Sequence, residues 1–440
     1  MKLSSDLFER LHGELRVVEL IDMHEHLPRD SELPTGDRVN IGRLFGHYAS
    51  CDLISAGMNR KDMQKVQSPD SDLDDQQRWN LLKPYYMKAW NTGYCEAVRT
   101  ACRDLFGVDD LRDDTVGDLV SAMRGKVKRG WTREVFDRAG IDYALLNSYG
   151  PKLLYNADMD PDCYIVDMSD SFTTFPIAEL AEQSGRGILC LDDYLEMIDW
   201  YFEQYAALAS AFKVGRAYDR TLAWRDVPRC EVEQTFNRLL AFSDRPDSRD
   251  IRALEDFVLH YVVRKCGEYG LTMKFHTGIQ EGTGNIITNS RAALMCDLFL
   301  KYPNTRFDIY HISYPYQEEL TVIAKNFPNV FVDFCWTWII NPSAARRALS
   351  DMLDAVPANK IHGFGGDYVF VEGSYGHSVI ARREIANVLC QKVEEGRFTE
   401  DYAVALGRML LRENAVENFD LAERRKRSIP VQKKACAACV

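Results

Sequence analysis

Short apolar runs rich in β-branched and aromatic residues recur along the chain, and segments with apolar residues at helical spacing separate most of them. Such runs predict buried strands, and the segments between them predict helices. Strands that alternate with helices predict a parallel sheet, and eight of them predict an α/β fold, the (β/α)8 or TIM-type barrel. The eight runs are Val17–Pro28, Ile141–Asn147, Cys163–Met168, Ala209–Val214, Leu271–His276, Thr305–His311, Val330–Phe334 and Lys360–Asp367.

The stretch from residue 29 to residue 130 interrupts this alternation. Its apolar residues recur at helical spacing and are broken by Gly and Asp, so it predicts a helical insertion after the first strand. The acid-rich segment Ser68–Gln77 within it is expected to be an exposed loop or cap. We expect residues 1–440 to form a single domain and residues 428–440 to be a flexible tail.

Composition and charge exclude several classes of protein. A formal net charge of −12 argues against a nucleic-acid partner, because phosphate binding needs a basic face. No window approaches the roughly 18 apolar residues of a membrane span, and the charged N-terminus does not resemble a signal peptide. With 12 cysteines scattered singly, the chain is expected to be cytoplasmic and reduced. Cys436 and Cys439 form an isolated C-x-x-C in the tail, for which a frayed terminus is the preferred interpretation.

Two histidines, His24 and His26, stand where the first strand ends. Side chains at i and i+2 of a strand point to the same side, so both imidazoles would face one direction. Neutral imidazole is a ligand for zinc, iron or manganese. Alone, the pair is also compatible with two hydrogen-bonded surface histidines.

The other residues that can bind a metal ion fall at equivalent places. Lys213, His276, His311 and Asp367 each lie at the C-terminal end of a predicted strand. The C-terminal strand ends of a closed barrel converge on one mouth, where such barrels place their chemistry. The joint placement therefore predicts a metal-dependent active site.

With these residues in place, the chain resembles the amidohydrolase superfamily. The matching segments are D-M-H-E-H, A-F-K-V-G-R-A-Y-D-R-T-L, K-F-H-T-G, I-Y-H-I-S-Y-P and G-F-G-G-D-Y. The long insertion, F-G-V-D-D-L, H-T-G-I-Q-E-G-T-G-N and the segment that follows Asp367 are similar to uronate isomerases. The K-V-G-R-A-Y-D-R-T-L segment, and His311 followed by Y-P, look more like the hydrolase branch labelled amidohydrolase 2.

One departure favours the hydrolase branch. The resemblance to uronate isomerases implies a serine-arginine run after the strand-eight aspartate, whereas here Tyr368, Val369 and Phe370 follow Asp367. Arg216 or Arg220 could replace that arginine, since Arg binds carboxylates in bidentate fashion. We therefore expect cleavage of an amide, lactone or ester of a small polar or anionic substrate. A sugar-acid isomerase is the first alternative, a decarboxylase the second, and a metal-binding scaffold protein the third.

The resemblance also implies roles for the residues. His24, His26 and Asp367 would hold one divalent ion, and His276 and His311 would complete that site or hold a second. Lys213 would either bridge two ions as a carbamate or remain an ammonium paired with an acid. Asp367 would act as general base and then as general acid on a metal-activated water.

Further residues are candidates for substrate contacts. Polar side chains of the glycine-rich loop and of the strand-eight segment would bind the substrate: Gln280, Glu281, Asn285 and Tyr368. Under the isomerase alternative Tyr375, His377, Arg382 and Arg383 would matter. Trp336 and Trp338 would either wall the pocket or pack in the core.

Cofactor and partners follow from the same resemblance. Zinc is the expected ion, with manganese, iron or nickel as alternatives and one or two ions per chain. The expected partners are a small-molecule substrate and a second copy of the chain in a homo-oligomer, with no nucleic acid and no membrane.

Overall fold

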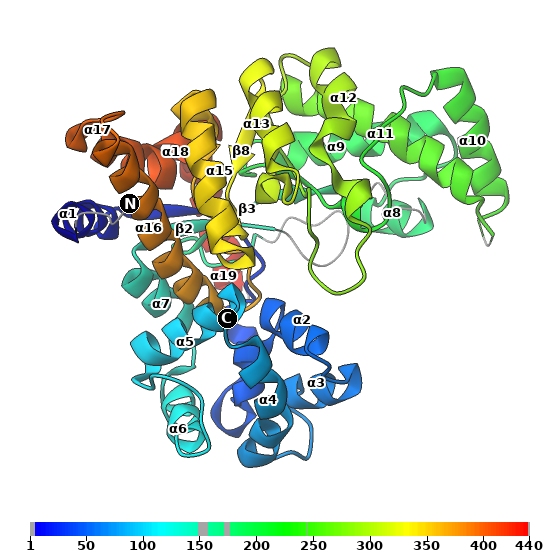
Figure 1. Ribbon diagram of the computed structural model, residues 1–440. Coiled ribbons are helices and arrows are strands. Elements are labelled where there is room, and N and C mark those ends of the chain that lie inside the picture. The colour runs from blue at the N-terminus through cyan, green and yellow to red at the C-terminus, as the bar shows by residue number, and fades with distance from the viewer. Residues whose placement is uncertain (1–4, 148–156, 171–176, 244, 439–440) are drawn as a thin grey trace. The chain divides into compact units, whose positions relative to one another are not determined.

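The computed structural model describes residues 5–147, 157–170, 177–243 and 245–438 (Figure 1). The chain forms two compact units. Unit 1 consists of Met1–Ala144, Gln280–Asn285 and Asp333–Ala415, and unit 2 of Leu145–Ile279, Ile286–Val332 and Val416–Val440. Both units are therefore built from segments that lie far apart in the sequence.

Neighbouring extended segments form the centre of unit 1. Strand β1 (Leu20–Glu25) is buried along its whole length and lies beside the start of β2 (Ile141–Leu146). On its other side lies the segment that begins with β9 (Ile361–His362). The Met23 N–H donates to the Phe364 carbonyl at 3.2 Å, and the Asp367 N–H donates to the His24 carbonyl at 2.8 Å. The ends of β1 and of the β9 segment therefore lie side by side.

The insertion after β1 is helical where the structure describes it. Its longer helices are α2 (Tyr48–Ser55), α3 (Arg60–Gln67), α4 (Asp75–Ala89), α5 (Gly93–Phe106) and α6 (Val116–Lys126), followed by α7 (Trp131–Ala139). Figure 1 shows α2, α3 and α4 packed together. The acid-rich segment Ser68–Gln77, expected to be an exposed loop or cap, is irregular up to Asp74, and Asp74 is the N-cap of α4. Its side chain accepts from the Gln77 N–H at 2.7 Å, and the Gln77 side chain accepts from the Asp74 N–H.

One long helix, α16 (Val371–Glu394), organises the rest of unit 1. It packs against α1 (Ser5–Arg16), α5, α7, α15 (Pro342–Ala355) and α17 (Glu400–Arg408). The short α14 (Thr337–Ile340) also contacts it. Because α16 starts a few residues after Asp367, its packing fixes where the strand-eight segment ends.

Unit 2 holds a parallel sheet whose strands pair in chain order. The strands are β4 (Met168–Ser169), β5 (Phe212–Val214), β6 (Met273–Phe275), β7 (Phe307–Ile309) and β8 (Val330–Asp333), and β3 (Tyr164–Val166) precedes them. The register places Lys213 opposite Lys274, and Lys274 opposite Asp308. Lys274 Nζ lies 2.8 Å from Asp167 Oδ2, with both side chains fully buried.

The helices of unit 2 alternate with these strands. They are α8 (Ile177–Ser184), α9 (Leu191–Tyr205), α10 (Arg229–Ala241), α11 (Ser248–Glu268), α12 (Cys296–Lys301) and α13 (Gln317–Asn326), with α19 (Leu421–Ala438) at the end of the chain. The short α18 (Asn414–Asn418) begins in unit 1 and ends in unit 2. Each of the eight predicted runs contains a strand, so the expected α/β fold class is confirmed.

The segment expected to be a flexible tail is helical over its described residues. Residues 428–438 continue helix α19, and Ser428 and Gln432 are buried in unit 2. The Gln432 amide donates to the Tyr164 carbonyl at 3.2 Å, and the Cys436 thiol donates to the Asp158 carbonyl at 3.2 Å. Cys439 lies outside the described residues.

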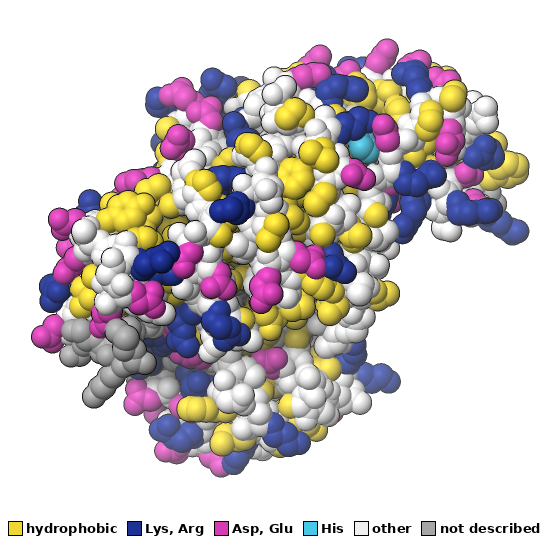
Figure 2. All heavy atoms as spheres, turned by 45° about the horizontal axis from the view of Figure 1, so that its top comes forward, with side chains coloured by type: hydrophobic (Ala, Val, Ile, Leu, Met, Phe, Trp, Pro, Cys, Tyr) yellow, Lys and Arg dark blue, Asp and Glu magenta, His cyan; other side chains and the backbone are white. Residues whose placement is uncertain are grey.

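Two surface properties complete the description. None of the described helices is long and apolar enough to cross a membrane. On the face drawn in Figure 2, basic and acidic side chains are interspersed, so the negative net charge is not gathered there into one patch.

Candidate metal centre

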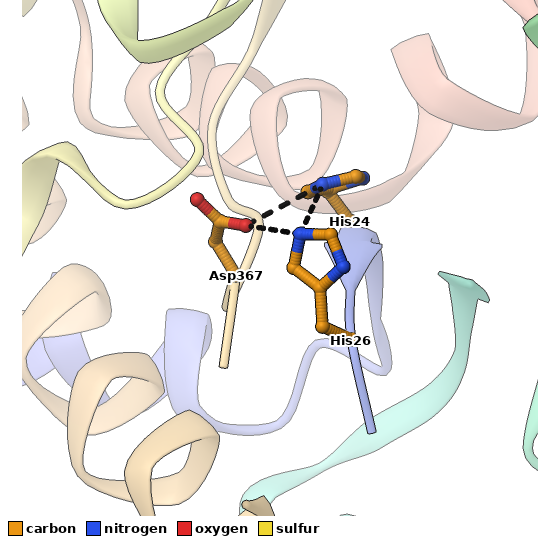
Figure 3. Close-up of side chains that lie close together, drawn as sticks. All are labelled: His24, His26 and Asp367. Carbon is orange, nitrogen blue, oxygen red and sulfur yellow. Dashed lines mark hydrogen bonds and ion pairs between the residues drawn. The ribbon is translucent and has the colours of Figure 1, made fainter. Parts of the chain in front are cut away.

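Two imidazoles and one carboxylate converge in unit 1 (Figure 3). His24 and His26 come from the end of β1, and Asp367 comes from the segment after β9. His24 Nε2 lies 3.1 Å from His26 Nε2, and Asp367 Oδ1 lies 3.4 Å from the first nitrogen and 3.1 Å from the second. The His24 side chain is fully buried, whereas the His26 side chain is 17% exposed and gives the group an open side.

The spacing of these atoms fits a bound divalent ion. Ligand atoms about 2.1 Å from a metal ion are about 3.0–3.4 Å from one another in octahedral or tetrahedral arrangements. The three donor atoms meet this condition, and all lie within 4.8 Å of one another. Two neutral imidazoles and a carboxylate suit zinc, manganese, iron or nickel. Of the six residues nominated as ligands, the three that lie in unit 1 therefore converge.

The backbone around this group is held in an uncommon conformation. Asp367 has φ +59°, and Trp336 and His47, also in unit 1, have φ +66° and +56°. Residues other than glycine seldom adopt these left-handed values, and such residues gather where function fixes the geometry. Surrounding hydrogen bonds must therefore hold Asp367 in place.

Sequence reasoning missed His47. This residue precedes α2, and its ring centroid lies 6.4 Å from that of His26. Burial lowers the pKa of His47 to about 4, so its imidazole is neutral near pH 7. Its Nδ1 is buried and has no hydrogen-bond partner among the described residues. The only available signal was a histidine just before a helical run, which is not specific.

Aromatic rings line the part of unit 1 next to His47. The Tyr48 ring stacks on the Trp336 ring at 4.2 Å and meets the Tyr368 ring edge-on at 5.2 Å. All three side chains are buried. Trp338 is fully buried and donates to the Gly363 carbonyl at 2.8 Å, which is core packing. Trp336 packs directly against the aromatic residues beside His47.

The glycine-rich loop contributes Gln280, Glu281 and Asn285 to unit 1. Gln280 is buried, and Glu281 and Asn285 are partly exposed. The Cys51 thiol lies 3.6 Å from Glu281 Oε1. Burial raises the pKa of Glu281, and the nearby Asp367 charge raises it further. Glu281 therefore lies close enough to the metal-binding group to sense its charge.

In unit 2, His276 and His311 form a second imidazole pair. His276 Nδ1 lies 3.2 Å from His311 Nε2, and His276 Nε2 lies 3.1 Å from the Ile279 carbonyl. Because a carbonyl only accepts, His276 Nε2 carries the hydrogen and leaves Nδ1 as an acceptor or ligand. His311 has φ +61°, which is again a strained backbone at a strand end.

Lys213 is buried on β5 of unit 2. Its Nζ lies 5.2 Å from the centroid of the Tyr310 ring, and Lys274 Nζ lies 5.5 Å from the same ring. Burial raises the pKa of Asp170 to about 6, an effect that the Arg216 charge and, less strongly, the Lys213 charge oppose. Lys213 therefore lies within electrostatic range of an acid that could pair with an ammonium.

Arg216 and Arg220, the residues expected to replace the missing arginine, already have carboxylate partners within unit 2. The Arg220 guanidinium is buried and contacts Glu255 at 3.1 Å and also Asp256. The Arg216 guanidinium contacts the same Glu255 and lies 3.2 Å from Asp219. Since these carboxylates neutralise both cations, the two arginines form an ion-pair network within unit 2.

Arg382, expected to contact the substrate, binds backbone carbonyls of unit 1. Its guanidinium is buried and donates to the carbonyls of Leu15, Val18 and Gly140 at 3.1–3.2 Å. Burial lowers its pKa to about 10. Val18 and Gly140 precede β1 and β2, so Arg382 binds backbone at the strand starts, whereas the metal-binding group lies at the end of β1.

The other residues nominated for isomerase chemistry have different surroundings. The Tyr375 hydroxyl donates to Asp104 at 3.4 Å, and Arg383 pairs with Glu96 at 2.8 Å. His377 is buried, with Nδ1 3.3 Å from the Gly366 carbonyl, and burial lowers its pKa to about 3. None of these three contacts a residue of the metal-binding group through a hydrogen bond or ion pair within the described chain.

Comparison with known sequences identifies the family. The family model described as amidohydrolase matches residues 151–421, which is more than half of the chain. This chain belongs to the amidohydrolase family. The match includes Lys213, His276, His311 and Asp367, and it begins after β1 with its two histidines. The protein fluG of Emericella nidulans is 25% identical over 152 residues, 34% of this amidohydrolase but only 18% of the fungal protein.

Solved structures share the fold of this amidohydrolase. The uronate isomerase of Thermotoga maritima aligns with a TM-score of 0.81 at 13% identity, covering 95% of this chain and 98% of that one. The glucuronate isomerase of Caulobacter crescentus aligns at 0.76 and 17% identity, covering 95% and 96%. A protein from Lactobacillus casei described as a metal-dependent hydrolase aligns at 0.64 and 15% identity, covering 94% and 98%.

Family and fold together confirm the predicted membership. The chain is an enzyme of the amidohydrolase superfamily, related in fold to uronate isomerases. Enzymes of this superfamily generally bind a divalent metal, and the buried His24, His26 and Asp367 provide donors for one. The identities to the solved structures lie below 20%, so they establish the fold and leave the reaction to the site residues.

Proposed function

We propose that this amidohydrolase is a metal-dependent hydrolase that cleaves an amide, lactone or ester bond of a small polar substrate. The observation that carries the proposal is the convergence of His24 Nε2, His26 Nε2 and Asp367 Oδ1 within 4.8 Å of one another, with His26 partly exposed. This group would hold the ion, and zinc is the first ion to test.

The residues then have distinct tasks. A divalent ion bound there would supply a Lewis acid and lower the pKa of a bound water toward neutrality. The Asp367 carboxylate would accept a proton from the attacking water and return it to the leaving nitrogen or oxygen. Glu281 and Asn285, on the neighbouring loop, would hydrogen-bond the polar parts of the substrate.

The arginines favour hydrolysis over sugar-acid isomerisation. A sugar acid carries a carboxylate that a bidentate guanidinium binds well. Arg216, Arg220 and Arg382, which were the candidates for that contact, are bound to carboxylates or carbonyls of the protein itself. Hydrolysis by a metal-activated water does not require an arginine that binds a substrate carboxylate.

A uronate isomerase-like reaction is the second candidate. Two observations favour it: the fold aligns with a uronate isomerase over 95% of the chain, and the neutral imidazole of His47 lies next to the metal-binding group. A neutral imidazole can move a proton between adjacent carbon atoms of an open-chain sugar. A decarboxylase has no specific support among these contacts.

Metal content is the first test. We expect elemental analysis of the purified protein to find at least one divalent ion per chain, and His24→Ala combined with His26→Ala to remove it. Two ions per chain, reduced to one by Lys213→Met, would support a bridging carbamate. No ion after reconstitution would refute the proposal.

A substrate screen then separates the two reactions. The metal-loaded enzyme is assayed against amides, lactones and esters and, in parallel, against uronates. Hydrolysis that Asp367→Asn abolishes while the variant retains its ion supports the hydrolase. Interconversion of uronates that His47→Gln abolishes supports the isomerase instead.

A further inference from the structure

Three consecutive backbone amides hold the Asp367 segment on strand β1. The Gly366 N–H donates to Asp22 Oδ1 at 2.8 Å, and the Asp367 N–H donates to the His24 carbonyl at 2.8 Å. The Tyr368 N–H donates to Glu25 Oε2 at 2.9 Å. The residues on both sides of Asp367 are therefore anchored by carboxyl groups.

The anchoring continues in the opposite direction. The His26 N–H donates to the Tyr368 carbonyl at 2.9 Å, and the His24 N–H donates to Asp22 Oδ1 at 3.2 Å. The Asp22 carboxyl thus binds one amide of the histidine strand and one amide of the Gly366–Tyr368 segment. A single side chain fixes the distance between the two parts of the metal-binding group.

Both carboxyl groups are fully buried in unit 1. Burial raises the pKa of Asp22 to about 6 and raises that of Glu25 well above its usual value. Two acids are costly at such a place, because a charged group without water must be stabilised by the protein. The amides of His24, Gly366 and Tyr368 supply hydrogen bonds to these two carboxyl groups.

Gly366 shows how closely the acids approach the backbone. A Cβ atom at this position would overlap Glu25 Oε1 and lie 2.9 Å from Asp22 Oδ2. The backbone of Gly366 therefore rests directly on both carboxyl groups, and glycine is the residue that permits this contact.

We propose that Asp22 and Glu25 are positioning residues for Asp367: by binding the amides of Gly366 and Tyr368 they clamp Asp367 in its left-handed conformation and aim its carboxylate at His24 and His26. This clamp does not touch the substrate. Its consequence for metal binding rests on the proposed function, whereas its effect on the backbone does not.

The clamp explains the strained φ of Asp367. A left-handed residue other than glycine is strained and persists only when its surroundings fix it. Hydrogen bonds to amides on both sides of a residue leave its backbone little freedom. Loss of either acceptor would let Asp367 relax and carry its carboxylate away from the two imidazoles.

The first test uses the metal-free protein, so it does not depend on the proposed function. Residues 363–368 lie outside helices and strands, yet the clamp requires their amides to be protected. Hydrogen exchange followed by mass spectrometry should show slow exchange of Gly366, Asp367 and Tyr368 in the unaltered protein. Exchange at the rate of an exposed loop would overturn the proposal.

Variants then identify the acceptors. Glu25→Met removes the acceptor and keeps a side chain of similar size, whereas Glu25→Gln keeps an oxygen for the Tyr368 amide. We expect Glu25→Met to speed exchange of the 366–368 amides at least tenfold and Glu25→Gln to restore protection. Equal exchange in the two variants would contradict the clamp.

A matched control separates positioning from general destabilisation. Glu384 is another buried carboxyl group of unit 1 that binds Arg346 and Arg383 and does not contact residues 366–368. Glu384→Met should lower the free energy of unfolding and leave exchange at residues 366–368 and metal affinity unchanged. If it affected them as Glu25→Met does, the proposed positioning role would be wrong.

Metal affinity measures whether the Asp367 carboxylate is oriented toward His24 and His26. Partners that orient metal ligands typically contribute 10–100-fold in affinity. Cobalt titration monitored by visible absorption should show a loss of this size in Glu25→Met and a loss of only a few-fold in Glu25→Gln. Faster exchange with unchanged cobalt affinity would refute the aiming role. If the unaltered protein bound no cobalt, the proposed function would be wrong. The hydrogen-exchange results would still test the clamp, because they do not depend on a bound metal ion.

Discussion

Arg382 is a buried guanidinium whose donors must be satisfied inside the protein. The carbonyls of Leu15, Val18 and Gly140 accept from it, and they lie near the starts of β1 and β2. An arginine in this arrangement joins three chain segments. These contacts give Arg382 a stabilising role.

Arg382→Met should lower the free energy of unfolding by at least about 2 kcal/mol, because a buried acceptor left unpaired costs about 1–3 kcal/mol. Arg383→Met is the matched control, since the Arg383 side chain is 39% exposed and its buried partner Glu384 keeps Arg346 as a second partner, so the loss should be at most about 1 kcal/mol. Urea unfolding and metal content are measured for both. If Arg382→Met lost turnover and kept its stability, Arg382 would instead be assigned to substrate binding.

Lys360 gives unit 1 a pH-dependent contribution to stability. Burial lowers the pKa of its ammonium to about 8 from its usual 10.5. The folded chain therefore binds this proton less tightly than the unfolded chain does. The energetic cost is fully present below pH 8 and disappears as the pH rises toward 10.5, so this residue makes stability increase with pH across that window.

Lys360→Met should remove this contribution. We expect the variant to be more stable than the unaltered protein at pH 7.5 and the difference to shrink steadily by pH 9.5. Urea unfolding at several pH values measures it, and the difference between the two proteins cancels other titrating groups. A difference that is constant with pH would show that Lys360 keeps its usual pKa in the folded state.

At the scale of elements, strands were the easiest to predict. Buried parallel strands read as apolar β-branched runs, and a histidine or aspartate at the end of such a run stands out. This is why His24, His26 and Asp367 could be assigned to one group before any geometry was known. His47 could not, because a left-handed residue before a short helix leaves no periodic pattern.

Partners separated in the sequence were also beyond prediction. Arg216 and Arg220 have the chemistry of a carboxylate site, but their carboxylates come from Glu255 and Asp256 on α11. The clamp at Gly366 could not be predicted either. Acids on a buried strand suggest metal ligands, and the backbone amides that bind them are known only from the structure. Helix α19 was not predicted because its many arginines and lysines suggest an exposed segment, whereas Ser428 and Gln432 are buried.

Close packing of α16 on α5 depends on Gly376. A Cβ atom there would overlap the Ala97 carbonyl. Gly376→Ala should destabilise unit 1 by about 1–3 kcal/mol, although alanine is the better helix former. Gly117→Ala in α6, where nothing lies within 4 Å of the new methyl group, should instead stabilise by up to about 1 kcal/mol. Thermal unfolding compares the two, and equal effects would contradict the packing argument.

At the scale of the whole molecule, metal binding and folding are coupled. An ion that binds only the folded state at 100 times its dissociation constant adds about 2.7 kcal/mol to stability. Removing the ion with a chelator should therefore lower the Tm by several degrees, and restoring zinc should reverse the loss. In His26→Ala the chelator should have no effect. A Tm that is unaffected in the unaltered protein would contradict a bound ion.

The clamp on Asp367 also determines when the metal-binding group can exist. The Tyr368 amide and its Glu25 acceptor are separated by 343 residues. At a synthesis rate of about 5–20 residues per second, roughly 17–70 s pass between them on the ribosome. During that time the two histidines and both acceptor acids are translated, whereas Asp367 and the amides of Gly366 and Tyr368 are not. Completion of the site is thus a late event in the life of each new chain.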